Sequence, residues 1–157
     1  MTGNLQKLKG LWTEENISSL RLATNKEVNL FQAENNLIIP QDLLEYFLSL
    51  NGTNEQYDKN FCQFYSFDHF KSINDELKNW SGSPDYSNII NTLKDYEDYF
   101  PFADYHCHFL SYVIRLHKDK TAENEIIVVC GDAYKHIANS FSEFIDLYLK
   151  DADQLQF

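Results

Sequence analysis

The sequence predicts one α+β domain over residues 1–157, in which an antiparallel β-sheet packs with several α-helices. Three observations favour this class. Three helix-type patterns precede any strand pattern, two strand-type runs at 108–117 and 125–130 are joined by a short polar turn, and a helix pattern closes the chain. A chain of this length buries about 70% of its unfolded surface, so its core is large enough to fold without a disulfide or metal.

The N-terminal segment predicts two short helices after a flexible lead-in, which is placed at residues 1–11. Thr13 is expected to cap a helix that runs to about Thr24 and turns Leu20 inward, because Thr is a favoured N-cap residue. Another short helix is expected over 25–36.

Residues 38–52 carry a complete helix signal. Pro40 suits the first turn, where its missing N–H has no intrahelical partner to lose. Asn51 and Gly52 suit the left-handed conformation that commonly ends a helix. The apolar positions fall on one helical face, which comprises Leu43, Leu44, Phe47 and Leu50.

The central segment predicts one strand and one helix. An aromatic run over 60–66 indicates the first strand, and Asp68 is expected to cap a helix that ends before the Ser-Gly-Ser-Pro sequence at 81–84. Residues 85–101 are acidic, aromatic and end at a proline, and we interpret them as a surface insert.

The C-terminal segment predicts a hairpin and a closing helix. Apolar and polar residues alternate over 108–117, as in a half-buried strand, and 125–130 is its expected antiparallel partner. Ser140 and Glu143 have capping-box spacing at the start of the last helix. The stripe that should face the core comprises Phe141, Phe144, Ile145 and Tyr148.

Taken in order, four parts of the chain resemble the SUKH superfamily, named partly after a yeast cell-wall synthesis regulator. They are a helical N-terminal region with Trp12, the Pro40–Gly52 helix, the Phe-Ala-Asp sequence at 102–104 and the helix pattern at 137–145. The resemblance implies an α+β fold. Many bacterial members are immunity proteins that bind and neutralise a cognate polymorphic toxin, often a nuclease. It therefore implies a non-enzymatic domain that covers its toxin stoichiometrically; the alternative is a housekeeping interaction or scaffold module like the yeast regulator.

The net charge restricts the classes of partner that the protein is expected to bind. Twenty-four acidic and 13 basic side chains give a net charge of −11, which disfavours direct binding to nucleic acid or to anionic membranes and attracts a basic protein. No run is apolar enough to cross a bilayer, and the N-terminus lacks the apolar core of a signal peptide. Three cysteines in apolar or aromatic surroundings indicate buried thiols, so we expect a cytoplasmic protein.

The acidic and aromatic segment from 85 to 104 is the candidate partner surface. Its tyrosines would supply contact area and its carboxylates would steer a basic partner. The alternative is a solvated loop whose tyrosines fold back onto the core. The candidate residues are Asp85, Tyr86, Asp95, Tyr96, Glu97, Asp98, Tyr99 and Asp104.

No catalytic or cofactor-binding pattern stands out. The sequence His106-Cys107-His108 is the one metal-like cluster, but a readable zinc site needs a second closely spaced ligand pair, and none follows. The chain has no Gly-x-Ser-x-Gly elbow and no Gly-rich phosphate loop. We therefore expect no metal, no cofactor and no enzymatic activity. The possible distant partners of the cluster are Cys62, His69, Cys130 and His136.

Overall fold

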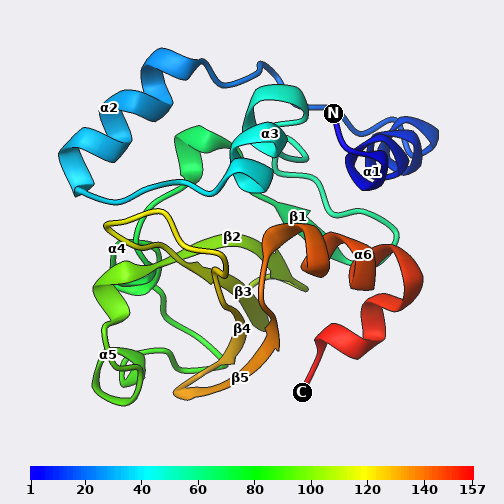
Figure 1. The fold of residues 1–157 in the computed structure, drawn as a ribbon. Helices are drawn as coiled ribbons and strands as arrows, with labels where there is room; N and C mark the ends of the chain where they lie inside the picture. The colour runs from blue at the N-terminus through cyan, green and yellow to red at the C-terminus, as the bar shows by residue number, and fades with distance from the viewer.

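A five-stranded antiparallel sheet lies at the centre of the protein, with its strands in chain order (Figure 1). The computed structural model describes all residues, 1–157. The predicted α+β class is confirmed. The strands are β1 Cys62–Phe64, β2 Tyr99–Tyr105, β3 Leu110–Arg115, β4 Ile126–Cys130 and β5 Ala133–Ala138.

Helices lie against both faces of the sheet, and none is long and apolar enough to cross a membrane. The α-helices are α1 Gly3–Glu14, α2 Asn25–Asn35, α3 Gln41–Ser49, α4 Ile73–Leu77, α5 Ile89–Thr92 and α6 Phe141–Asp151. Three short 3-10 helices, η1 Phe67–His69, η2 Tyr96–Asp98 and η3 Ala152–Leu155, complete the helical elements.

The larger core lies between one face of the sheet and α1, α3 and α6. Phe144 of α6 is fully buried, and its ring lies 4.9 Å from that of Phe102 and 5.2 Å from that of Tyr112. The predicted stripe of α6 is therefore confirmed, and so is its start, because the Ser140 hydroxyl accepts a hydrogen bond from the Glu143 N–H. Aromatic rings packed edge to face give this core much of its contact area.

A smaller core covers the opposite face of the sheet, and it corrects the interpretation of 85–101 as a surface insert. Ile89 and Leu93 are buried against Val113 of β3 and Ile127 of β4, and Tyr99 begins strand β2. Strand β3 is consequently buried on both faces, not half-buried as its alternation predicts. The segment looks polar in sequence because only every few residues turn inward.

The N-terminal prediction is wrong in two places. Residues 3–11 belong to α1, whose Leu5, Leu8 and Trp12 are buried, so this stretch is no flexible lead-in. The helix expected to start at Thr13 does not form: α1 ends at Glu14, and Leu20 is 86% exposed on an irregular segment. The apolar spacing of this segment has no helical cap to support it, and extended backbone leads to α2 instead.

Helices α2 and α3 form where the sequence predicts them. Thr24 and Glu27 form a capping box at the start of α2. Pro40 precedes the first residue of α3, and Asn51 and Gly52 follow its end with φ angles of 55° and 90°. Leu43, Phe47 and Leu50 are buried as expected, whereas Leu44 is only partly buried.

Two further features differ from the sequence expectation. The helix predicted after Asp68 is split: η1 is followed by α4, which is capped by the Ser72 hydroxyl and not by Asp68. Strand β5 is unpredicted, because its residues 133–136 are exposed and lack apolar alternation. Its strand conformation depends on pairing with β4, where Val129 lies opposite Tyr134.

Candidate functional site

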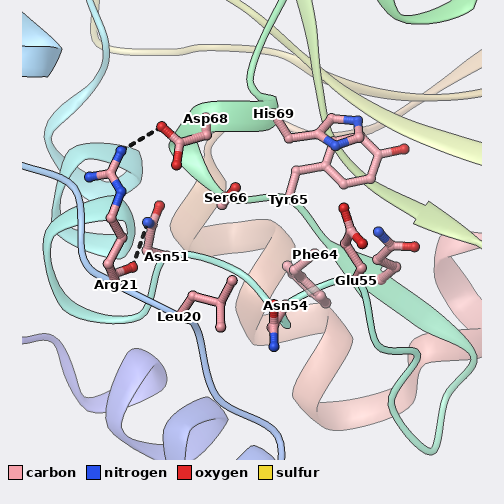
Figure 2. Close-up of a pocket in the computed structure, with 11 residues that line it drawn as sticks. Leu20, Arg21, Asn51, Asn54, Glu55, Phe64, Tyr65, Ser66, Asp68 and His69 are labelled. Atoms are coloured by element: carbon pink, nitrogen blue, oxygen red, sulfur yellow. Dashed lines mark hydrogen bonds and ion pairs between the residues drawn. The ribbon is translucent and has the colours of Figure 1, made fainter.

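An open pocket of about 340 Å³ lies beside β1, where three segments from different parts of the chain meet (Figure 2). The irregular segment before α2 supplies Leu20 and Arg21, and the loop after α3 supplies Asn54 and Glu55. Strand β1 and the turn that follows it supply the remaining wall, namely Gln63, Phe64, Tyr65, Ser66, Asp68 and His69.

Asn51 joins these three segments. Its side chain is 1% exposed, and its amide nitrogen donates to the Arg21 carbonyl at 2.8 Å while its amide oxygen accepts from the Phe67 N–H at 2.7 Å. A buried amide satisfied at both ends fixes backbone positions that loops otherwise leave free. The Asn-Gly sequence that ends α3 thus also builds the pocket.

Gly52 brings the loop against β1 more closely than any other residue could. Its φ is 90°, and a Cβ placed there would lie 2.7 Å from the Ser66 nitrogen and 2.9 Å from the Phe64 carbonyl oxygen. Glycine adopts this conformation without steric penalty. The next turn holds Asn54 and Glu55 in the left-handed region, with φ angles of 52° and 59°, so the rim of the pocket is tightly defined.

Arg21 closes one side of the pocket, and its positive charge is balanced by two neighbouring carboxylates. Its guanidinium lies 2.5 Å from the Asp68 carboxylate and 2.8 Å from that of Glu27. Hydrogen bonds from Arg21 and Thr24 lower the pKa of Glu27 to about 2. The guanidinium joins the start of α2 to η1, as the dashed contact to Asp68 in Figure 2 shows in part.

His69 and Tyr65 form the aromatic wall of the pocket. Their rings stack with centroids 4.1 Å apart and an interplanar angle of 28°. Tyr65 is 1% exposed, whereas the His69 side chain is 32% exposed, so the imidazole is the accessible part of the stack.

Behind this wall, one buried carboxylate holds two imidazoles. The Glu76 side chain is 5% exposed and lies 2.9 Å from His69 Nε2, 3.2 Å from His108 Nε2 and 3.3 Å from Lys71 Nζ. Burial raises the pKa of Glu76, but the hydrogen bonds from His108 and His69 outweigh it and lower the pKa to about 2. The hydrogen bond that the His108 imidazole donates to Glu76 also raises the pKa of His108.

Asp104 is part of this buried network and not of an exposed surface. It is 0% exposed and accepts hydrogen bonds from the hydroxyls of Tyr57 at 2.7 Å and Tyr65 at 3.0 Å and from the His108 N–H at 3.1 Å. Burial raises the pKa of Tyr65 well above its ordinary value, so this hydroxyl stays a donor. Asp104 therefore positions the His108 turn and the wall of the pocket.

The other candidate partner residues divide into exposed and buried sets. Asp85, Asp95 and Glu97 are exposed, and Tyr96 and Asp98 are partly exposed. Tyr86 and Tyr99 are 3% and 4% exposed, so these two tyrosines fold back onto the core. The Tyr86 hydroxyl donates to the His108 carbonyl at 2.6 Å, and the Tyr99 hydroxyl donates to Glu125 at 2.5 Å.

Four exposed or partly exposed carboxylates form an acidic ridge, which we define as Asp95, Glu97, Asp98 and Glu125. Arg115 lies among three of them: its guanidinium is 2.8 Å from Asp95, 3.6 Å from Glu125 and 4.0 Å from Asp98. Three carboxylates thus share one guanidinium and Glu97 adds a fourth negative charge, so the ridge keeps a net negative charge.

The His106-Cys107-His108 sequence is a tight turn between β2 and β3. All three residues have left-handed φ angles, between 51° and 64°, which removes the strand geometry that would have pointed both imidazoles to one face. Cys107 is exposed, contrary to the expectation of a buried thiol, whereas Cys62 is buried. No group of three His, Cys, Asp or Glu side chains is arranged to hold a metal ion.

The protein is thus an α+β domain with an open pocket at one edge of its sheet. The loops that form this pocket are held together by a buried asparagine. The sequence model of the SMI1 / KNR4 family (SUKH-1) matches residues 22–147, and the chain belongs to this family. The matched range contains the buried His108 network, the acidic ridge and the whole pocket lining except Leu20 and Arg21. No curated protein matches the chain.

Proposed function

We propose that this protein is a non-enzymatic, cytoplasmic immunity protein that binds a cognate basic toxin in a stoichiometric complex. It inhibits by covering the substrate-binding surface of the toxin, in many cases a nuclease, and needs no chemistry of its own. Membership of the SUKH-1 family supports this function, because the resemblance implies toxin-neutralising relatives.

The acidic ridge is the observation that carries the proposal. Its carboxylates exceed their one guanidinium partner, and the whole chain has a net charge of −11. A surface of this kind attracts a basic protein at long range and repels nucleic acid, so it can occupy the place of a phosphate backbone.

The proposed contact surface contains fewer residues than the sequence pattern predicts. It retains Asp85, Asp95, Tyr96, Glu97 and Asp98, which are exposed or partly exposed. The three buried residues do not contact the partner directly. Their hydrogen bonds hold the strands and turns that carry the exposed residues; they are Tyr86, Tyr99 and Asp104. Tyr96 is the one remaining aromatic contact.

A titration of toxin activity tests the function. Where a toxin domain is encoded beside this gene, that domain is purified and assayed with increasing amounts of this protein. A binding inhibitor should abolish activity linearly, with the end point at an equimolar ratio when both proteins are well above Kd. Inactivation by far less than one equivalent would show that the protein acts catalytically, and full activity at excess would contradict neutralisation.

A scaffold function predicts a different outcome from the same preparation. Tagged protein would then retain endogenous cellular proteins, and no toxin would be encoded nearby. The ridge would still serve as a contact surface in that case, but its partner would belong to the cell's own complexes.

A further inference from the structure

We propose that the pocket beside β1 receives an arginine side chain of the partner. This inference rests on the proposed function, since it specifies how a basic partner is recognised. The pocket lies on segments outside the acidic ridge, so it adds a second, directional contact to one that acts mainly through long-range charge.

The charges around the pocket favour a cation. Glu27 and Asp68 already share the guanidinium of Arg21, at 2.8 and 2.5 Å. Glu55 stands on the opposite rim, is exposed and enters no ion pair. The pocket lining therefore carries two carboxylates, Asp68 and Glu55, and one guanidinium, so a second guanidinium would restore the balance.

The shape of the lining favours arginine over lysine. The exposed imidazole of His69 offers a flat face, backed by the Tyr65 ring at 4.1 Å. A planar guanidinium stacks on such a face and forms two parallel hydrogen bonds with one carboxylate, whereas an ammonium does neither. Asn54 and Gln63 line the same pocket, and a side-chain amide oxygen is an acceptor for the remaining guanidinium donors.

The pocket is prepared before any partner arrives. Asn51 fixes its three segments through hydrogen bonds at 2.7 and 2.8 Å, and Gly52 presses the rim against β1. Its volume of about 340 Å³ is near the lower limit of small-molecule sites, which suits one side chain. A rigid pocket loses little conformational entropy when it is filled.

Nuclear magnetic resonance titration of the 15N-labelled protein tests the pocket without any toxin. The probe is Nα-acetyl-arginine amide, raised to about 50 mM because a single side chain in an open pocket should bind with a millimolar Kd. We expect saturable shifts of the Asn54, Glu55, Gln63 and His69 amide signals. The corresponding lysine and citrulline amides serve as controls. Lysine keeps the positive charge of arginine, and citrulline keeps the planar shape of its head group without the charge. Shifts that do not saturate, or equal affinity for lysine amide, would overturn the proposal.

The variant Glu55→Gln removes the free carboxylate and keeps the side-chain size. It should weaken arginine amide binding by about two- to fivefold, as expected for an exposed ion pair. Glu34→Gln, on the exposed face of α2, is the matched control and should leave binding unchanged. Equal binding by wild type and Glu55→Gln would overturn the assigned role of Glu55.

The same variant separates this inference from the proposed function. In a toxin titration at concentrations near Kd, Glu55→Gln should show a raised Kd for the toxin, whereas well above Kd the end point should stay equimolar. A toxin bound with undiminished affinity by Glu55→Gln would overturn the pocket and leave the immunity function standing. A protein that binds arginine amide but inhibits no toxin would contradict the immunity function and not the chemistry of the pocket.

Discussion

The two faces of the sheet are built in different ways. One face is covered by α1, α3 and α6, whose apolar stripes bury aromatic rings such as Phe144 and Phe47. The other face is covered by α4, α5 and irregular chain, which bury fewer and mainly aliphatic side chains. The larger core relies on regular helices, and the smaller core on single residues placed by turns.

This difference between the two cores indicates which part of the protein carries the charged side chains available for binding. Glu76 and three carboxylates of the ridge, Asp95, Glu97 and Asp98, lie within residues 73–99, which supply the helical part of the smaller core. Short elements leave more polar side chains at the surface for each residue buried. We therefore expect stability to depend mainly on the larger core, and the long-range attraction of a basic partner to depend mainly on groups held by the smaller one.

The largest effect should come from Phe144→Ala in the larger core. Phe144 is 0% exposed and packs against rings from β1, β2, β3 and α6, so its removal leaves a cavity that rigid neighbours cannot fill. We expect the free energy of unfolding in urea to fall by about 3–5 kcal/mol. Phe109→Ala is the control, since Phe109 is 52% exposed. An equal loss in both variants would contradict the assigned core.

Leu93→Ala should have a smaller effect, because the smaller core can relax around the cavity. We expect a loss at the lower end of the usual range for buried leucine, about 2–3 kcal/mol. Ile90→Ala provides the control, as Ile90 is 38% exposed. Hydrogen exchange should also show residues 86–93 opening at lower free energy than β3. A loss as large as that of Phe144→Ala would remove the distinction between the two cores.

Glu76→Gln should destabilise by about 1–3 kcal/mol, because Gln cannot serve as the charged acceptor of both imidazoles. The pKa of Glu76 is lowered from 4.5 to about 2, so its contribution is present above pH 4.5 and lost as pH falls through about 2. The pKa of His108 is raised above 6.5, so its contribution is full below pH 6.5 and declines as pH rises through the raised value. The difference from wild type should therefore be greatest between pH 4.5 and 6.5.

Unfolding of the two proteins across this pH range measures the effect. His136→Gln is a suitable control, because His136 is exposed on β5 and lies outside the Glu76 network. A difference that stayed constant with pH would show that Glu76 acts through packing and not through charge.

The smallest effect on stability, and a clear one on binding, should follow from reversing the ridge charges with Glu97→Lys and Asp98→Lys. Asp95 is kept because it holds Arg115 at 2.8 Å. We expect the toxin association rate to fall by about tenfold at low salt, with unfolding changed by at most about 0.5 kcal/mol. The control reverses Glu14 and Glu34, which changes the net charge equally at exposed helical positions. Equal slowing in both would mean that net charge, and not the ridge, steers the partner.

The sequence by itself determined the elements whose signals are local. Helices α2, α3 and α6 have caps, stops and apolar stripes within their own residues, and β3 and β4 have alternating or continuous apolar runs joined by a polar turn. These signals depend on neighbours a few residues away, so they can be found without knowing the fold.

Only the tertiary structure decided the smaller core, strand β5 and the pocket. Tyr86, Tyr99 and Asp104 look like surface residues in an acidic segment, but partners more than twenty residues away bury them. Asn51 is recognisable as a helix stop, yet its contacts with Arg21 and Phe67 exist only when three segments meet. Burial of a polar group depends on partners brought from distant parts of the chain, and no local pattern encodes them.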